Sequence, residues 1–373
     1  MRVTVVGGLA QSLVNFRGEM LRSMAAHGHE VLALAPENDV GVRTALEGMG
    51  VSYATFPLHR AGTNPFQDLA TVASLTRTVH TFRPDAILVY AAKPVIYGLL
   101  AARLAGVPLR AAMITGVGSA LSGSSGLRRS ALAVTMRRLY AVALGQADVV
   151  FFQNPDDERL FRSMGLVGDR HRVVRINGSG VDLERYVPAP MPPAPITFLM
   201  IGRLIREKGI GEYVEAARRV LGAQPHVRIQ LLGPLDPNPG GISARDLEVL
   251  RAEGTVEYLG STADVRPFIA RAHVCVLPSY YGEGVPHSVL EAMAMGRPVL
   301  TTDVPGCRET VVFGRNGYLV PPRDAGALAQ TMLKMLLEPE RLEAMGRQSR
   351  AIAEERFDVH SVNRAILCAM GLD

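Results

Sequence analysis

The sequence predicts an α/β protein made of two doubly wound, Rossmann-like domains. Short apolar runs bounded by turn residues alternate along the chain with stretches of helical periodicity, and this alternation is typical of parallel strands joined by crossover helices. Five prolines between residues 188 and 195 interrupt the alternation, which then begins again. Because proline cannot continue a helix or a central strand, we expect a linker there. The length of 373 residues fits two domains.

The expected strands lie where apolar runs meet turn residues. In the first domain they cover residues 3–6, 31–35, 53–58, 86–90, 111–115, 149–153 and 173–177. In the second domain they cover residues 197–201, 228–232, 256–259, 274–278, 299–302 and 318–320. Stretches with helical spacing include 211–221, 286–295 and 357–370. We therefore expect domains at 1–187 and 196–355, a linker at 188–195, and a C-terminal helix within 356–373.

Composition restricts the class of protein. A chain that is 48% hydrophobic and 20% charged is expected to be globular rather than disordered. It has no apolar run long enough to span a bilayer, and its first residues do not resemble a signal peptide, so we expect a cytoplasmic protein. The three cysteines, Cys275, Cys307 and Cys368, are too scattered for a disulfide framework or a metal site, and we expect buried thiols.

The charge is concentrated in the first half. Residues 1–186 carry 20 Arg and Lys against 14 Asp and Glu, a formal charge of +6, while the remainder carries −1. A basic half suits an anionic partner such as nucleic acid, a phospholipid surface or a phosphorylated substrate. The absence of tryptophan, of a recognisable RNA or DNA motif and of a dense basic tract argues against nucleic acid.

The first candidate site follows the first strand of the second domain. There Gly202 ends the apolar strand, Arg203 comes next, and Lys208 stands just before a helix. Arginine offers a rigid fork of donors, lysine a mobile charge and the helix start free amides, so the three together can neutralise a diphosphate. Taken alone, the segment is also compatible with an ordinary surface loop.

The second candidate site surrounds a helix predicted at 286–295, with Pro286 in its first turn and Gly296 at its far cap. Glu283 lies in the loop before this helix and Glu291 lies inside it. Each carboxylate can accept two hydrogen bonds from sugar hydroxyls, and the free helix amides suit phosphate. A third candidate is the Gly7–Gly8 turn after the first strand, where the lack of side chains lets backbone approach phosphates.

These motifs resemble glycosyltransferase family 4. The resemblance rests on two glutamates separated by seven residues, downstream of a GR-x4-K-G segment, and extends through Gly306, Glu309 and residues 316–320. It implies a retaining enzyme with the GT-B fold, whose two Rossmann-like domains face a central cleft. It also implies a UDP-sugar as donor substrate and no cofactor.

The resemblance also assigns roles to residues. Arg203 and Lys208 are expected to bind the donor diphosphate, Glu291 the ribose and Glu283 the hydroxyls of the transferred sugar. The expected donor-binding residues are Gly7, Gly8, Arg203, Lys208, Glu283, Gly284, Val285, Pro286, Ser288 and Glu291, of which Arg203, Lys208 and Glu283 are assigned to catalysis. Negative charge that builds on the departing phosphate would be stabilised by Arg203, Lys208 and the helix amides, so no metal is expected. By analogy with the family, the C-terminal helix is expected to cross back to the first domain.

A narrower resemblance concerns the first domain, which is then expected to bind the acceptor. Residues 12–17, 92–98, 115–120 and 152–157 resemble the bacterial branch that extends undecaprenyl-diphosphate-linked sugars and includes alpha-1,3-N-acetylgalactosaminyltransferases. It implies a lipid-linked acceptor, GalNAc as the best guess for the transferred sugar, and a role in O-antigen, capsule or protein-glycan assembly. The enzyme would then be peripheral at the inner face of the cytoplasmic membrane. The expected acceptor contacts are Lys93, Gly116, Gly118, Arg128 and Arg129.

Some alternatives stay open at this point. The basic, partly apolar stretch 126–146 fits an anionic membrane or a lipid diphosphate, but it equally fits a core-facing helix with solvated arginines. Many family members present a histidine from the first domain, but none occurs here between His80 and His171, and no catalytic histidine is assigned. The turn at Gly7 lacks the dinucleotide-binding fingerprint, which argues against a dehydrogenase. Other donors, a soluble acceptor, a UDP-sugar epimerase and a non-catalytic binding module remain as alternatives.

Overall fold

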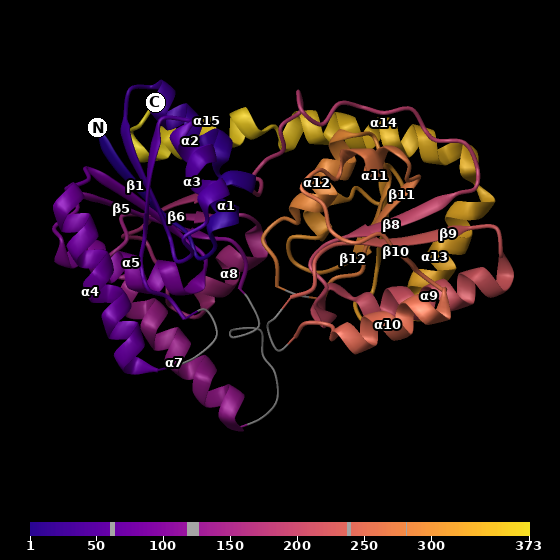
Figure 1. Cartoon of the computed structure of the whole chain (residues 1–373), viewed down its shortest axis with the longest axis horizontal. Coiled ribbons are helices and arrows are strands. Elements are labelled where there is room, and N and C mark those ends of the chain that lie inside the picture. Colours follow the sequence, from indigo (N-terminus) through magenta and orange to yellow (C-terminus); the bar gives the residue numbers. More distant parts are fainter. Residues whose placement is uncertain (60–63, 118–126, 237–239, 281) are drawn as a thin grey trace. The chain divides into compact units, whose positions relative to one another are not determined.

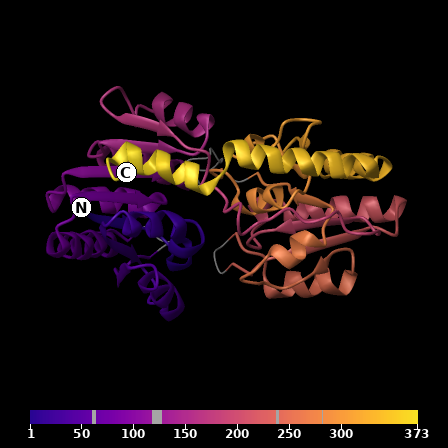
Figure 2. The same cartoon turned by 90° about the horizontal axis from the view of Figure 1, so that it is seen from above.

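The computed structural model describes residues 1–59, 64–117, 127–236, 240–280 and 282–373. The side chains of residues 127–132 lie outside this description. The chain forms two compact units (Figures 1 and 2). Unit 1 comprises Met1–Gly180, Gly282–Val285 and Val359–Asp373, and unit 2 comprises Val181–Tyr281 and Pro286–Asp358. The first change of unit therefore falls at Gly180, before the predicted boundary at residue 187, while residues 188–195 form neither helix nor strand.

Unit 1 is built on a seven-stranded parallel sheet with the order β3-β2-β1-β4-β5-β6-β7. The strands are β1 (Arg2–Val6), β2 (Glu30–Ala35), β3 (Val51–Thr55), β4 (Ala86–Tyr90), β5 (Leu109–Ile114), β6 (Val149–Phe152) and β7 (Arg172–Arg175). Val3 pairs with both Val31 and Ala86, so β1 lies between β2 and β4. All five residues of β4 are buried, as expected where helices cover both faces of a parallel sheet.

Helices cover the two faces of this sheet. They are α1 (Ala10–Asn15), α2 (Gly18–Ala26), α3 (Val40–Glu47), α4 (Pro65–Phe82), α5 (Ala92–Leu104), α7 (Leu127–Leu144), α8 (Pro155–Ser163) and α15 (Val359–Met370). One core contains Leu88 of β4 with residues from α1, α2, α3 and α15. The other contains Ile87 and Val89 with residues from α4, α5, α7 and α8. The strand period of two thus distributes one apolar run over two cores.

Unit 2 repeats the plan with a six-stranded parallel sheet of order β10-β9-β8-β11-β12-β13. Its strands are β8 (Thr197–Ile201), β9 (Arg228–Leu232), β10 (Glu257–Tyr258), β11 (Val274–Leu277), β12 (Val299–Thr302) and β13 (Gly317–Val320). Its helices are α9 (Ile210–Ala223), α10 (Ala244–Glu253), α11 (Arg266–Ala270), α12 (His287–Ala294), α13 (Ala325–Leu337) and α14 (Pro339–Arg356). The prediction of two doubly wound domains is therefore confirmed.

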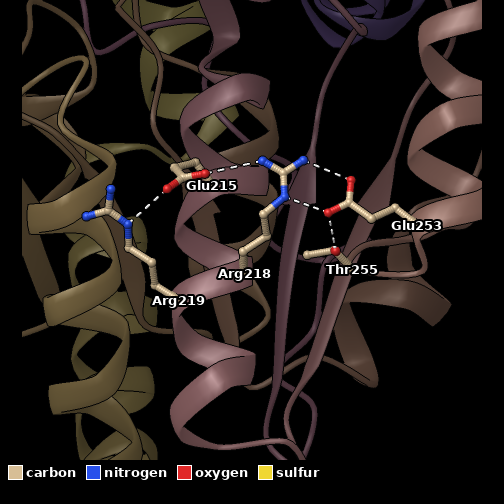
Figure 3. A network of polar contacts seen from close by, with 5 residues as sticks. All are labelled: Glu215, Arg218, Arg219, Glu253 and Thr255. Carbon is tan, nitrogen blue, oxygen red and sulfur yellow. Dashed lines mark hydrogen bonds and ion pairs between the residues drawn. The ribbon is translucent and has the colours of Figure 1, made fainter.

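The outer surface of α9 carries a network of charges rather than a site. Figure 3 shows Arg218 between two acidic side chains, donating to Glu253 (Nη2–Oε2, 2.8 Å) and to Glu215 (Nη1–Oε2, 3.2 Å). Arg219 donates to the other oxygen of Glu215, and Thr255 donates to Glu253. Hydrogen bonds from Arg218 and Thr255 lower the pKa of Glu253 to about 2. The network ties α9 to the end of α10.

Several details differ from the sequence-based expectations. Helix α12 begins at His287, with Pro286 in an extended conformation at its N-cap, because a proline that starts a helix can stand just outside the first turn. Cys275 and Cys307 are buried, but Cys368 is exposed, because it lies on the outer side of α15 while Leu367 faces the core. No helix in the described ranges combines the length and apolar character needed to cross a membrane.

Candidate active site

In both sheets the order of the strands reverses next to the first strand. The reversal lies between β1 and β4 in unit 1 and between β8 and β11 in unit 2. In doubly wound sheets the ligand sits beyond the carboxyl ends of the strands at this switch point. The predicted residues of unit 2 gather there. Arg203 follows β8, and Lys208 is the last residue of a short 3₁₀ turn farther along the same loop. Helix α12 begins after the loop that leaves β11.

The guanidinium of Arg203 is held by an acidic residue that the sequence analysis did not identify. Its Nη1 pairs with Oδ2 of Asp236, whose side chain is only 4% exposed, whereas that of Arg203 is 45% exposed. Asp236 follows β9, the neighbour of β8, and parallel bridging of Leu204 with Leu235 brings the two segments together. An exposed arginine with a buried carboxylate behind it is oriented in advance toward an anion.

Lys208 is followed by a glycine, Gly209, at a position where a side chain would clash. Gly209 has a φ of +80°, and a Cβ there would lie 2.0 Å from the carbonyl oxygen of Pro278. This close approach locks the turn that carries Lys208 to the loop after β11. The Lys208 side chain folds back over Gly202, with its Cδ 3.8 Å from the position of a Cβ on that residue. Lys208 and Arg203 therefore stand at the same strand end.

Helix α12 brings Ser288 and Glu291 to the same place. Ser288 Oγ donates to the carbonyl oxygen of Ile201, the last residue of β8 (3.0 Å). Tyr186 donates its hydroxyl to Oε1 of Glu291 (2.6 Å), and His287 Nδ1 lies 3.2 Å from the same oxygen. Burial and the adjacent carboxylate raise the pKa of Tyr186, which keeps it a donor. Tyr186 was not identified from the sequence, because it precedes the proline-rich segment without any motif of its own.

Glu283 belongs to unit 1 by its contacts, whereas Glu291 belongs to unit 2. Within unit 1, Gly284 N donates to the Thr115 carbonyl oxygen (3.1 Å) and Val285 N to Oε1 of Gln153 (3.3 Å). Gly116 has a φ of +122°, and a Cβ there would lie 2.5 Å from the Gly282 carbonyl oxygen, so this position favours glycine. The segment Gly282–Val285 thus lies against the carboxyl ends of β5 and β6. Gly116, predicted to contact the acceptor, directly neighbours it.

The Gly7–Gly8 turn lies at the switch point of unit 1. Gly7 N donates to the Leu34 carbonyl oxygen (2.9 Å), and a Cβ on Gly7 would lie 2.4 Å from the Tyr90 hydroxyl. That hydroxyl makes a 2.8 Å hydrogen bond with Ser12 Oγ. The glycine is therefore required for the close approach of β1 and β4 at their carboxyl ends.

The remaining acceptor candidates are placed as follows. Lys93 lies in the first turn of α5, where Nζ donates to the His59 carbonyl oxygen (2.7 Å) and to Oδ1 of Asp68 (3.2 Å). Its charge is thus shared with α4, and its contact with an acceptor stays a prediction. Arg128 and Arg129 lie in the first turn of α7, with side chains outside the described residues, and Gly118 also lies outside them. In the described ranges, no group of three His, Cys, Asp or Glu side chains is placed to hold a metal ion.

The chain matches two domain families. Residues 14–177 match the glycosyl transferase 4-like domain, and residues 195–338 match glycosyl transferases group 1. The N,N'-diacetylbacillosaminyl-diphospho-undecaprenol alpha-1,3-N-acetylgalactosaminyltransferase of Campylobacter jejuni is 28% identical over 356 residues, which cover 92% of this chain and 91% of the relative.

Solved structures agree on the fold. Sucrose-phosphate synthase from Thermosynechococcus elongatus superposes with a TM-score of 0.81 at 20% identity and covers 99% of this chain and 98% of its own. HepE from Anabaena, solved in complex with UDP, has a TM-score of 0.76 at 20% identity over the full length of both chains. These matches confirm the GT-B fold. The chain belongs to the glycosyltransferases whose first domain is of the 4-like family and whose second is of group 1.

Proposed function

We propose that this glycosyltransferase moves a hexose or N-acetylhexosamine from a UDP-sugar to a sugar carried on undecaprenyl diphosphate, with GalNAc as the favoured donor sugar. The observation that carries the proposal is the gathering of Arg203, Lys208, Ser288 and Glu291 at the switch point of unit 2. Two cations suit a diphosphate, and the largely buried carboxylate of Glu291 suits the paired hydroxyls of a ribose. The UDP bound in the structure of HepE supports this choice of donor.

The proposed chemistry is electrostatic. As the bond from the sugar C1 to the UDP oxygen breaks, negative charge develops on the β-phosphate, and Arg203, oriented by Asp236, and Lys208 stabilise it without a metal ion. Tyr186 and His287 both engage Oε1 of Glu291, which directs Oε2 to a ribose hydroxyl. The acceptor hydroxyl attacks the face that UDP leaves, and the departing phosphate takes its proton, so configuration is retained. Glu283 binds hydroxyls of the transferred sugar and forms no bond to C1.

The lipid-linked acceptor is supported by the name of the Campylobacter relative, which acts on an undecaprenyl-diphosphate sugar. A membrane-bound substrate requires a surface that reaches the bilayer, and unit 1 offers one between α4 and α5. There Leu69, Val72 and Leu104 line a 420 Å³ groove bordered by Arg77 and His80. Leu69 is 67% exposed and Leu104 69% exposed. Apolar side chains beside basic ones suit an anionic phospholipid surface.

The membrane surface is tested by flotation with vesicles that contain anionic phospholipid. Leu69→Glu is expected to reduce the bound fraction severalfold. Val249→Glu, at an apolar position on α10 of unit 2 that is 59% exposed, serves as the matched control and is expected to bind like the parent. Equal binding by both variants would remove this surface from the proposal.

The proposed reaction is tested by incubating the purified protein with a panel of UDP-sugars and an undecaprenyl-diphosphate-linked N-acetylhexosamine in detergent, with EDTA present. Release of UDP and a matching mass gain on the lipid, for one donor, are expected. A mass gain with a soluble acceptor instead would redirect the acceptor assignment. A donor that changes without transfer would indicate an epimerase, and donor binding without any product would indicate a binding module.

A further inference from the structure

Arg17 is a buried cation with no ion-pair partner among the described residues. Its side chain is 2% exposed, and two of its three guanidinium nitrogens, Nε and Nη1, are fully buried and make no hydrogen bond in the part of the chain that the structure describes. The ion pairs of the described residues include none with Arg17. Buried polar groups are nearly always hydrogen-bonded, and a buried charge is more costly still when it is unpaired. The guanidinium therefore requires an acceptor that the described residues do not supply.

A second buried arginine of the same protein, Arg297, has a hydrogen-bond partner for each nitrogen of its guanidinium. Arg297 in unit 2 is 1% exposed, and all of its nitrogens have partners. Its Nε donates to Ile269 O (3.0 Å), its Nη2 to Pro190 O (2.9 Å) and Ala270 O (3.1 Å), and its Nη1 to the Met191 sulfur (3.5 Å). Arg297 thus ties three chain segments together. Within the described ranges, Nε and Nη1 of Arg17 make no such hydrogen bonds, so the same structural explanation does not account for them.

The position of Arg17 relates it to a ligand site. It lies between α1 and α2, with its guanidinium 5.1 Å from the ring centroid of Tyr90, the last residue of β4. The hydroxyl of that ring bonds Ser12 and lies against Gly7, the residue that follows β1. The unsatisfied cation is therefore at the β1–β4 switch point, where a doubly wound sheet binds its ligand.

The charge state of Arg17 suits an anion. Burial lowers the pKa of Arg17 only to about 10, so the side chain stays protonated at neutral pH. The acidic residue of this region, Glu37, accepts a hydrogen bond from Ala10 N (2.7 Å). A planar guanidinium binds phosphate oxygens through parallel N–H donors.

We propose that Arg17, with Tyr90 and the Gly7–Gly8 turn, forms an anion subsite in unit 1 that takes a phosphate or diphosphate group. The inference rests on the proposed function for its two natural sources of that group, the nucleotide sugar and the polyprenyl-diphosphate acceptor. It adds a second cationic position to those of unit 2, and it assigns Arg17 to substrate binding rather than to packing.

The test measures binding of inorganic pyrophosphate by calorimetry in a Lys208→Ala background, which weakens the site in unit 2. Arg17→Lys keeps the buried charge but loses the planar fork, and we expect it to weaken binding about tenfold. Arg297→Lys is the matched control, because it makes the same exchange at the satisfied buried arginine, and it is expected to bind within twofold of the parent. Arg17→Met, if it folds, is expected to abolish binding at this subsite. Pyrophosphate affinity within twofold of the parent in Arg17→Lys would overturn the proposal.

Two further arms identify the source of the anion. If Arg17→Lys weakens the binding of farnesyl diphosphate but not that of UDP, the subsite serves the acceptor. The reverse result assigns the subsite to the donor. Sugar transfer is measured in parallel with the Arg17 variants in the otherwise native chain. Arg17-dependent pyrophosphate binding in a protein that transfers no sugar would leave the subsite standing and remove the proposed function. Parental sugar transfer together with parental pyrophosphate binding in Arg17→Lys would leave the proposed function standing and remove the subsite.

Discussion

The two units share a sheet order at their switch points but differ in how the charges there are balanced. In unit 2, Arg203 is paired with Asp236, and Glu291 is engaged by Tyr186 and His287. In unit 1, Arg17 has two buried nitrogens with no acceptor among the described residues. Sheet topology thus fixes where a ligand can bind, while the pairing of side chains decides whether the charges at that place are already balanced. The side chains of unit 2 hold one another in place, whereas the proposed subsite of unit 1 would be completed by a bound anion.

The largest effect is expected from removing a cation of unit 2. Lys208→Ala should lower turnover about 10²- to 10³-fold, because the charge on the departing phosphate loses one of its stabilising groups. Initial rates of UDP release measure this, and Arg203→Ala should act similarly. Lys334→Ala, an exposed lysine on α13, is the matched control and should keep parental turnover. Near-parental turnover in both Lys208→Ala and Arg203→Ala would break the assignment of unit 2 as the donor site.

A backbone substitution should separate the scaffold of unit 2 from its charges. Gly209→Ala places a Cβ 2.0 Å from the Pro278 carbonyl oxygen at a φ of +80°, and should destabilise unit 2 by about 3 kcal/mol or more. Gly211→Ala, two residues later in α9 with no atom within 4 Å of the new Cβ, should be neutral or stabilise by about 0.5 to 1 kcal/mol. Urea unfolding of both variants tests the pair. Equal midpoints would show that the turn tolerates a side chain.

Unit 1 contains a buried carboxyl, that of Asp157, whose deprotonation lowers the free energy of unfolding. Burial raises the pKa of Asp157 from 3.8 to about 6, although Asn154 Nδ2 donates to it at 2.9 Å. The folded state therefore holds the proton more tightly, and this stabilising contribution is present below about pH 4 and lost as pH rises through 6. Asp157→Asn should remove that slope and stabilise the protein at pH 7.5 by up to about 3 kcal/mol. The free energy of unfolding measured from pH 5 to 8 checks it, and an unchanged slope would contradict it.

Loss of one hydroxyl should test the preorganisation of Glu291. Tyr186→Phe removes the 2.6 Å donor to Glu291, and should raise the KM for the UDP-sugar about tenfold with kcat within about twofold. Tyr213→Phe removes a buried hydroxyl that donates to Phe198 O in the core of the same unit, and should lower stability without a change in KM. Steady-state measurement of KM and kcat for the two variants tests this expectation. A fall in kcat alone would mean that Tyr186 does not act on donor binding.

The smallest effect is expected at the charge network of Figure 3. Arg218→Ala removes the partner of Glu215 and Glu253 at a fully exposed position, where ion pairs contribute little. The melting temperature should change by less than about 2 °C. Because the pKa of Glu253 is lowered to about 2, what the pair contributes is present above pH 4.5 and is lost on acidification. A large change in the melting temperature at pH 7.5 would show that unit 2 depends on this surface.

The sequence predicted the sheets well because their signals are local. The apolar run 86–90 became β4 without change, and Arg203 and Lys208 follow β8 while Glu291 lies in the helix after β11, as their spacing predicted. The partners Asp236 and Tyr186 were missed because tertiary packing, not sequence proximity, brings them to Arg203 and Glu291. The missing hydrogen-bond acceptor of Arg17 among the described residues could not be read from the sequence for the same reason, since it depends on which side chains the fold brings near.

The discontinuity of unit 1 has a consequence for biosynthesis. Val362, Ile366 and Met370 of α15 complete the same core as Leu21 of α2, yet they are separated from Gly180 by almost the whole of unit 2. At 5 to 20 residues per second, a ribosome needs about 10 to 40 s to reach α15 after residue 180 has been made. During that interval, while unit 2 is being synthesised, the apolar surface of unit 1 that α15 covers stays exposed. The nascent chain is therefore expected to depend on chaperones at its N-terminal half until α15 has been made.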